Sequence, residues 1–303
     1  MPGKFHFLIA LILFFPDRIV AQDSLRLLTW NIQMLPSLVK RNGKAKRAKA
    51  IVEQLQKQSY DVVVFEELFK KRSRRIITKG LSNNFRYHTA VLNKKSIALK
   101  TNGGVMIFSK HPIDSVHQIR YKERTGFDRL SRKGALLAEL NFNGKSVQVI
   151  GTHLQAFGPA DIMHSQYQQL HDELLKPHTK AGVPQFICGD FNTIKNIASI
   201  LPAGVTQDQV DRLPRFQYLL KTLDAFDGNL EGSQQFTMDR PFNDLCKTRK
   251  DFRLLLDYVL IRNLSELQLT VSRRVKIMRQ AWHKQHQDLS DHFGVEAIIS
   301  GIK

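Results

Sequence analysis

The chain has 303 residues, a formal net charge of +19 at pH 7 and only two cysteines, Cys188 and Cys246. So few cysteines exclude a disulfide-stapled scaffold, although a pairing between these two stays open. The excess of cations favours anionic partners such as nucleic acid, acidic lipid headgroups or cell-surface polyanions. Charge alone does not choose among these partners.

The N-terminal segment has the pattern of a secretory signal peptide. Lys4 precedes nine consecutive apolar residues at 7–15, and Ala21 offers a small residue for cleavage. The apolar stretch is shorter than the roughly 20 residues of a membrane-spanning helix, and no later run is long and apolar enough. We therefore expect a secreted or periplasmic protein with a signal peptide at 1–21 and a single domain at 22–303. The alternative is a buried helix of the mature fold.

Strands predominate among the predicted elements, with helices interspersed. Apolar runs predict strands, in chain order, at 25–35, 60–69, 102–113, 134–155, 183–194, 252–261 and 288–299. Asn143-Gly144 is a strong hairpin turn, which divides 134–155 into two strands. Helical spacing predicts helices at 45–58, with the basic face outward, and at 165–175.

No internal repeat or linker divides the chain into two domains. Residues 200–250 are the least regular part and are expected to form long surface loops, and the cationic run 70–75 has the composition of a solvated helix or loop face. Strands with interspersed helices favour an α/β sandwich over a simple alternation of strand and helix.

Polar side chains gather where the predicted strands end. They are Asn31, Glu67, His153, Asp190, Asn192, Asp257, Asp291 and His292. Several have an ordinary explanation alone, such as an Asx-turn at Asp190. Asp257 is harder to dismiss, because a carboxylate inside an apolar strand is costly to bury without a partner, and a histidine is its natural partner. Carboxylate, amide and imidazole groups without thiolates suit a hard cation such as Mg²⁺.

The motifs as a set resemble those of the endonuclease/exonuclease/phosphatase superfamily, which has the deoxyribonuclease-I-like fold. They are "TWNIQ", "DVVVFEELF", "GTHLQA", "GDFN", "LDYVL" and "SDHFGVEA". The resemblance covers nearly the whole mature chain. It implies a four-layered α/β sandwich with two packed mixed β-sheets flanked by helices, and a hydrolase of phosphate esters that depends on Mg²⁺ or another divalent cation.

The resemblance also implies a role for each matched residue. Glu67 would hold the metal, with Asn31 and Asp291 close by. His292 would be the general base, and Asp257 would orient it. The remaining matched residues would position the nucleophile and the phosphate; they are Asp190, Asn192, His153 and Lys133. The chain departs from the family at Glu66, where members often have Gln or Asn before the metal-binding Glu.

Within the superfamily, "NGGVMIFSKHPI", "DRLSRKGAL" and "GTHLQAF" resemble the secreted neutral sphingomyelinases. This branch implies hydrolysis of sphingomyelin in membrane surfaces by a peripherally bound enzyme; no protein partner is implied, and a monomer is expected. The alternative is a secreted nuclease on the same fold, which the positive charge favours. A non-catalytic membrane-binding protein is a third hypothesis, against which the intact set of acids, amides and histidines argues.

The segment 275–287, "VKIMRQAWHKQHQ", resembles a β-hairpin whose exposed aromatic tip contacts the membrane in this branch. Trp282 occupies the comparable place, with cations nearby, and tryptophan favours the bilayer interface. Trp282 is therefore expected to contact the membrane. The alternative is that its ring packs into the protein core.

Overall fold

The computed structural model describes residues 24–36, 43–94, 101–156, 158–195, 212–246, 253–262 and 268–302. The expected signal peptide at 1–21 therefore lies outside the described residues. Within the described ranges, no helix combines the length and the apolar character needed to cross a membrane.

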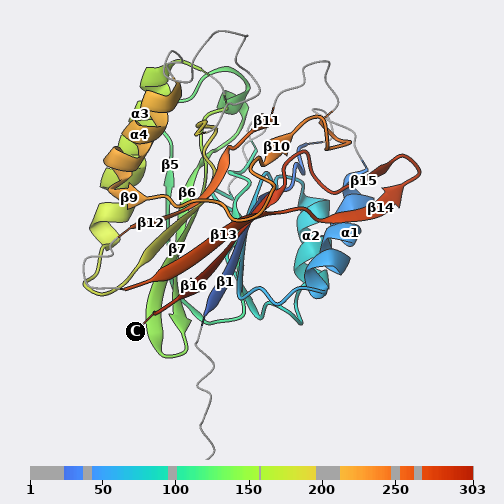
Figure 1. Ribbon diagram of the computed structural model, residues 1–303, viewed down its shortest axis with the longest axis horizontal. Coiled ribbons are helices and arrows are strands. Elements are labelled where there is room, and N and C mark those ends of the chain that lie inside the picture. The colour runs from blue at the N-terminus through green and yellow to red at the C-terminus, as the bar shows by residue number, and fades with distance from the viewer. Residues whose placement is uncertain are drawn as a thin grey trace, which may run out of the picture.

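Two six-stranded mixed sheets form the centre of the fold (Figure 1). The first sheet has the order β13-β16-β1-β2-β4-β3 and the second β5-β6-β7-β8-β12-β9. The strands of the first sheet are β1 (Leu25–Asn31), β2 (Val62–Glu66), β3 (Tyr87–His88), β4 (Met106–Ser109), β13 (Thr270–Lys276) and β16 (Gly294–Ser300). Those of the second are β5 (Ile113–Arg120), β6 (Gly134–Phe142), β7 (Lys145–His153), β8 (Gln185–Asp190), β9 (Ala225–Phe226) and β12 (Asp257–Arg262).

Each sheet contains one parallel pair, β1 with β2 and β7 with β8, and its other neighbouring strands are antiparallel. The β6–β7 hairpin turns at Asn143 and Gly144, whose φ angles are 53° and 87°. These left-handed conformations are those of a two-residue hairpin turn, so the predicted turn is confirmed.

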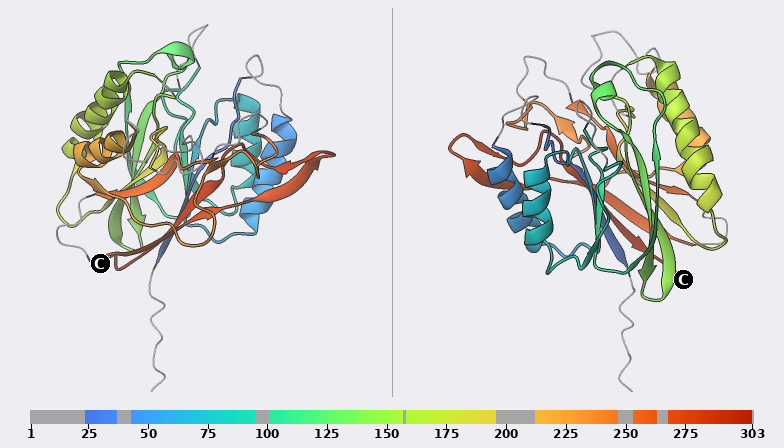
Figure 2. Two further views of the ribbon diagram at one scale, coloured as in Figure 1. Left: turned by 45° about the horizontal axis from the view of Figure 1, so that its top comes forward. Right: turned by 180° about the vertical axis from the view of Figure 1, so that it is seen from behind.

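Helices cover the outer faces of both sheets (Figure 2). Their bounds are α1 (Lys44–Gln56), α2 (Lys71–Gly80), α3 (Ala160–Leu170) and α4 (Arg212–Leu223), and α3 continues through η2 (His171–Leu175) and η3 (Lys176–His178). The helices α1 and α2 pack on the first sheet, and α3 and α4 on the second. A further apolar cluster fills the space between the sheets. These four layers confirm the predicted α/β sandwich.

The cationic run 70–75 lies mostly in helix α2, where Lys71, Arg72 and Arg75 are exposed, so the predicted solvated face is found there. Two other local predictions need correction. The region 200–250 is not all loop, since α4 lies within it. The basic face of α1 is not all outward: the Arg47 side chain is fully buried. Its guanidinium donates hydrogen bonds to carbonyls of two loops, which replace the water that it loses.

Shorter elements lie at the ends of the sheets. They are the helix η1 (Gly126–Leu130), the pair β10 (Met238–Asp239) and β11 (Arg253–Leu254), and the hairpin of β14 (Arg279–His283) and β15 (His286–Asp288). The hairpin packs beside α1, as Figure 1 shows. Cys188 and Cys246 are both buried free thiols, so the pairing that the sequence left open is absent.

Candidate active site

The two parallel strand pairs end at the same polar centre. In the first sheet Asn31 of β1 lies opposite Glu66 of β2, and in the second His153 of β7 lies opposite Asp190 of β8. A hydrogen bond of 3.0 Å from Asn31 Nδ2 to Asp190 Oδ2 joins the two sheets. The packing of the sheets therefore brings together residues that are far apart in sequence.

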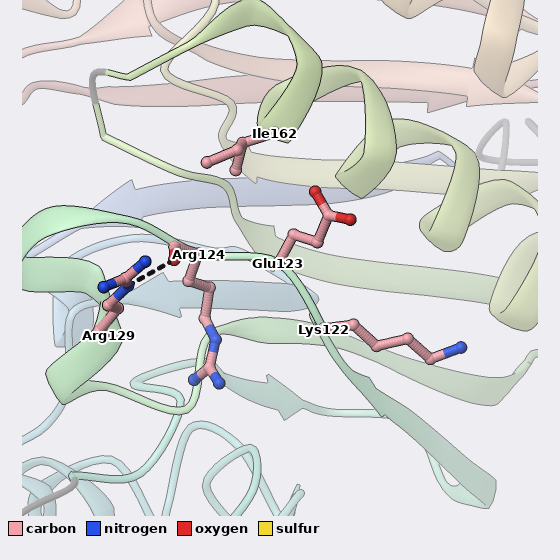
Figure 3. A pocket seen from close by; sticks show the side chains of 5 residues that line it. All are labelled: Lys122, Glu123, Arg124, Arg129 and Ile162. Atoms are coloured by element: carbon pink, nitrogen blue, oxygen red, sulfur yellow. Dashed lines mark hydrogen bonds between the residues drawn. The ribbon is translucent and has the colours of Figure 1, made fainter.

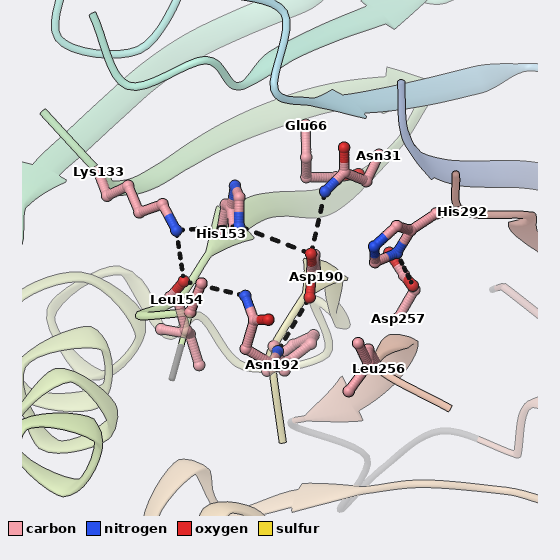
Figure 4. Close-up of polar contacts among 12 residues, drawn as sticks. Asn31, Glu66, Lys133, His153, Leu154, Asp190, Asn192, Leu256, Asp257 and His292 are labelled. Carbon is pink, nitrogen blue, oxygen red and sulfur yellow. Dashed lines mark hydrogen bonds and ion pairs between the residues drawn. The ribbon is translucent and has the colours of Figure 1, made fainter. Parts of the chain in front are cut away.

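His292 and Asp257 form a buried hydrogen-bonded pair in this centre (Figure 4). His292 Nδ1 lies 2.8 Å from Asp257 Oδ2. Burial alone lowers the pKa of His292, but the charge and the hydrogen bond of Asp257 outweigh burial and raise this pKa well above 6.5. The carboxylate thus fixes the orientation of the ring and makes it a stronger base, with Nε2 as its second nitrogen.

Asp190 is held by backbone and side-chain donors. Its Oδ2 accepts from Asn31, and its Oδ1 accepts from the backbone N–H of Asn192 at 3.0 Å. Asn192 itself donates from Nδ2 to the carbonyl of Leu154. Burial and the nearby charge of Asp257 raise the pKa of Asp190 to about 6. Two carboxylates in one buried centre repel each other, and a cation there would relieve the repulsion.

His153 and Lys133 stand on the other side of Asp190 in Figure 4. Lys133 Nζ lies 3.0 Å from His153 Nε2 and 2.9 Å from Asp128 Oδ1. Burial and the Lys133 charge lower the pKa of His153 well below 6.5, so its ring is neutral. Lysine can only donate, so Nε2 is the acceptor and Nδ1 carries the proton. No described residue accepts a hydrogen bond from this buried Nδ1.

The two adjacent glutamates occupy different environments. Glu66, the last residue of β2, is fully buried and accepts a hydrogen bond of 2.8 Å from the Thr29 hydroxyl. Burial and the charge of Asp257 raise its pKa well above the ordinary value. Glu67 follows at a φ of 55°, and burial and the charge of Asp291 raise its pKa to about 7. The charge of Asp257 thus acts mainly on Glu66, which lies on the same face of β2 as Val62 and Val64 of the cluster between the sheets, and the charge of Asp291 acts mainly on Glu67.

Sequence reasoning missed three residues that support this centre. Gln33 donates from Nε2 to Asp291 Oδ2. Asp128 forms the ion pair with Lys133 described above. Arg47 joins the loop after β1 to the segment before β16 through the carbonyls of Gln33 and Leu289. The position of Gln33 in "TWNIQ" was the available signal; nothing in the sequence marks Arg47 as buried.

Trp282 lies outside the polar centre, on β14. Its ring is half-buried and stacks on His286, with ring centres 5.3 Å apart. A Cβ at Gly43 would lie 2.3 Å from this ring, so only glycine leaves room for it. Trp282 Nε1 donates to the carbonyl of Asp288 at 2.8 Å. The ring is therefore packed against the start of α1 and only partly exposed, and its contact with a membrane stays a prediction.

The donor set fits a hard divalent cation. Glu67, Asp291, Asp190 and Asn31 supply carboxylate and amide oxygens, and the described part of the centre contains no thiolate. Asp190, Asp257 and His292 also offer ligand atoms within 4.8 Å of one another. Among the described residues no donor reaches the buried Oδ1 of Asp257 or Oε2 of Glu66. Buried oxygens without a donor are consistent with a bound cation or water in this centre.

A comparison with models of protein families shows to which family the chain belongs. The model of the Endonuclease/Exonuclease/phosphatase family matches residues 28–292. The chain belongs to this family. Its match begins in β1 and ends at His292, so it includes every residue of the polar centre described above.

Individual relatives and structures narrow the similarity. The chain is 31% identical over 192 residues to a sphingomyelinase C of Leptospira interrogans; the match covers 56% of this chain and 34% of the relative, about a third of its length. It is 26% identical to a sphingomyelinase C of Bacillus cereus, over 92% of this chain and 89% of the relative. A mutant of Staphylococcus aureus beta toxin, solved with bound magnesium ions, superposes with a TM-score of 0.76 at 26% identity, over 90% of this chain and 99% of the other.

Proposed function

We propose that this protein is a secreted, Mg²⁺-dependent phosphodiesterase that hydrolyses sphingomyelin to ceramide and phosphocholine. The observation that carries the proposal is the buried Asp257–His292 pair beside Asp190, at the convergence of two parallel strand pairs. The sphingomyelinase C similarity over nearly the full chain supports the substrate. The signal-peptide pattern at 1–21 supports secretion.

In this mechanism His292 takes a proton from the attacking water. Asp257 holds Nδ1, which leaves Nε2 to accept the proton as the water oxygen bonds to phosphorus. The bond from phosphorus to the ceramide oxygen then breaks, the leaving alkoxide takes up a proton from solvent, and phosphocholine and ceramide are released. A positioned base of this kind contributes about 10² to 10⁴ in rate.

The other side chains bind the phosphate and the metal. Neutral His153, with Nδ1 as its donor, and Lys133, as a positive charge, would contact the phosphoryl oxygens. Asp190 and Asn192 would position the nucleophile. Glu67, Asn31 and Asp291 would hold the Mg²⁺. The bound ion supplies charge neutralisation at the phosphate and stabilises the leaving alkoxide.

A nuclease is the second candidate, because the net charge of +19 favours a polyanionic substrate. One assay separates the two: purified protein with Mg²⁺ is given sphingomyelin vesicles and plasmid DNA in parallel. We expect phosphocholine release and intact plasmid. Plasmid cleavage without phosphocholine release would replace the proposed function with the nuclease.

Contact with a membrane is part of the proposal. The β14–β15 hairpin exposes His283, Lys284 and Gln285 at its tip, so its contribution would be polar and cationic. Trp282 would hold this hairpin in place through its packing on Gly43. A larger apolar contact with the bilayer would come from another part of the surface.

A further inference from the structure

The most exposed large apolar side chain among the described residues lies on the loop that contains η1. Phe127 is 92% exposed, and Leu130 on the same short helix is 52% exposed. An exposed phenylalanine costs free energy in water that burial would recover. Two such side chains on one short helix form an exposed apolar patch, and exposed apolar patches bordered by polar residues often mark interaction sites.

This loop is fastened to the body of the protein. Asp128, the neighbour of Phe127, accepts a hydrogen bond of 2.7 Å from the backbone of Ala156 and pairs with Lys133. Thr125 exchanges two hydrogen bonds with the Gln155 side chain. The hydrogen bonds of Thr125 and Asp128 thus order the loop that exposes Phe127. An ordered loop loses less conformational entropy when the ring binds a partner.

The same fastening connects the loop to the polar centre. Lys133 links Asp128 to His153, so Phe127 lies at the phosphate side of the proposed active site. Figure 1 places η1, the short green helix at the top, at the end of the molecule where β10 and β11 also lie. A surface bound through Phe127 would therefore lie next to the mouth of the site.

Cations surround the apolar residues. A pocket of about 450 Å³ beside the loop is lined by Lys122, Glu123, Arg124, Arg129 and Ile162 (Figure 3). Its lining has three cations and one acid, and Lys122 is already paired with Glu173. Burial and the nearby charges of Arg120 and Arg132 lower the pKa of Arg124. In Figure 3 the Glu123 carboxylate lies on the side of Ile162, and the head groups of Lys122, Arg124 and Arg129 point away from it. The loop therefore offers separate cationic groups around Phe127 that favour an anionic surface.

We propose that the loop 125–131 is a membrane-docking loop. Phe127 and Leu130 enter the boundary between headgroups and acyl chains of a bilayer, while Arg124 and Arg129 bind the phosphate of an anionic lipid. Apolar side chains next to cations suit an anionic bilayer better than a protein surface. The inference rests on the proposed action at a membrane and supplies the apolar contact that the hairpin tip lacks.

The test measures binding to vesicles that contain no sphingomyelin, so it is independent of hydrolysis. Full-length protein is sedimented with phosphatidylcholine vesicles, with and without phosphatidylserine. Phe127→Ser is expected to weaken binding about tenfold, because the ring is lost from the interface. Arg129→Gln is expected to weaken binding about fivefold on the anionic vesicles only. Both positions are exposed, so the melting temperature should not change.

Phe226→Ser is the matched control, because Phe226 is 60% exposed but lies on β9 at the edge of the second sheet. It should bind like the wild type. Phe127→Trp should keep binding and shift its fluorescence to the blue on vesicles. The proposal is overturned if the wild type does not bind anionic vesicles, if Phe127→Ser binds like the wild type, or if Phe226→Ser loses as much. Absence of phosphocholine release with normal vesicle binding would reject the proposed function alone.

Discussion

The two parallel strand pairs have the same strand arrangement but end in different side chains. β1 ends in Asn31 and β2 in Glu66, which Glu67 follows, whereas β7 and β8 end in His153 and Asp190. The first pair lies near the charge of Asp291, and the second is joined to the Lys133 cation. Under the proposed function, the first end would hold the metal ion together with Asp190, and His153 and Lys133 at the second end would bind the phosphate.

Two residues at or just before the start of other strands join the ends of these strand pairs. Asp257 opens β12 in the second sheet, and His292 stands just before β16 in the first. Their hydrogen bond crosses from one sheet to the other. Under the proposed function, metal binding and phosphate binding would be centred on different strand pairs, with Asp190 close to both and His292 between them. Variants at the two ends should differ in how their activity depends on Mg²⁺.

The largest effect is expected from removing the metal. Chelation with EDTA should abolish hydrolysis, and added Mg²⁺ should restore it. Glu67→Gln should raise the Mg²⁺ concentration needed for half-maximal activity, because it removes a negative ligand. His153→Gln, from the other strand pair, should lower the rate at saturating Mg²⁺ without changing this midpoint. Equal midpoints for the two variants would contradict the division of roles.

His292→Ala tests the proposed proton acceptor, which lies between the ends of the two strand pairs. We expect the turnover number to fall by about 10² to 10⁴, because the proton acceptor is lost. Calorimetric titration should show that Mg²⁺ still binds, since the proposed ligands remain. Turnover near that of the wild type would show that another group is the base.

Asp257→Asn should lower turnover by about 10², within the range that a positioned base contributes. Asp257 raises the pKa of His292, so its charge keeps the ring protonated up to a higher pH. The base must be neutral to accept a proton. Loss of the carboxylate should therefore move the acidic limb of the kcat/KM profile to lower pH. A limb that stays in place, or moves to higher pH, would show that Asp257 does not set this pKa.

Trp282→Ala should have the smallest effect. Loss of the packed ring should lower the melting temperature. It should also displace the hairpin and weaken vesicle binding several-fold, because each cation moved away from the membrane surface loses about 1 kcal/mol of binding free energy. Hydrolysis of a soluble phosphocholine ester should be retained, because Trp282 lies outside the polar centre. His283→Ala, an exposed neighbour, is the control for stability. Unchanged vesicle binding with a lower melting temperature would assign Trp282 a purely structural role.

The sequence by itself predicted an α/β sandwich and singled out most of the residues that meet in the polar centre, and the family resemblance added the four layers. Period-two and helical patterns predict strands and helices from neighbours a few residues apart, which is why β1, α1, β2, β6, β7 and β8 are found near their expected places. The polar residues at strand ends stand out because each interrupts an apolar run. Asp257 is the clearest, since a buried carboxylate requires a partner.

Only the tertiary structure decided how these residues meet. The contacts of Arg47 with Leu289 and of Asn31 with Asp190 join positions 242 and 159 residues apart, and no local pattern encodes such distances. No local pattern predicts that the ring of Trp282 packs against Gly43 either. Burial depends on which surfaces the packed sheets and helices leave covered, and this is fixed only when the whole chain has folded.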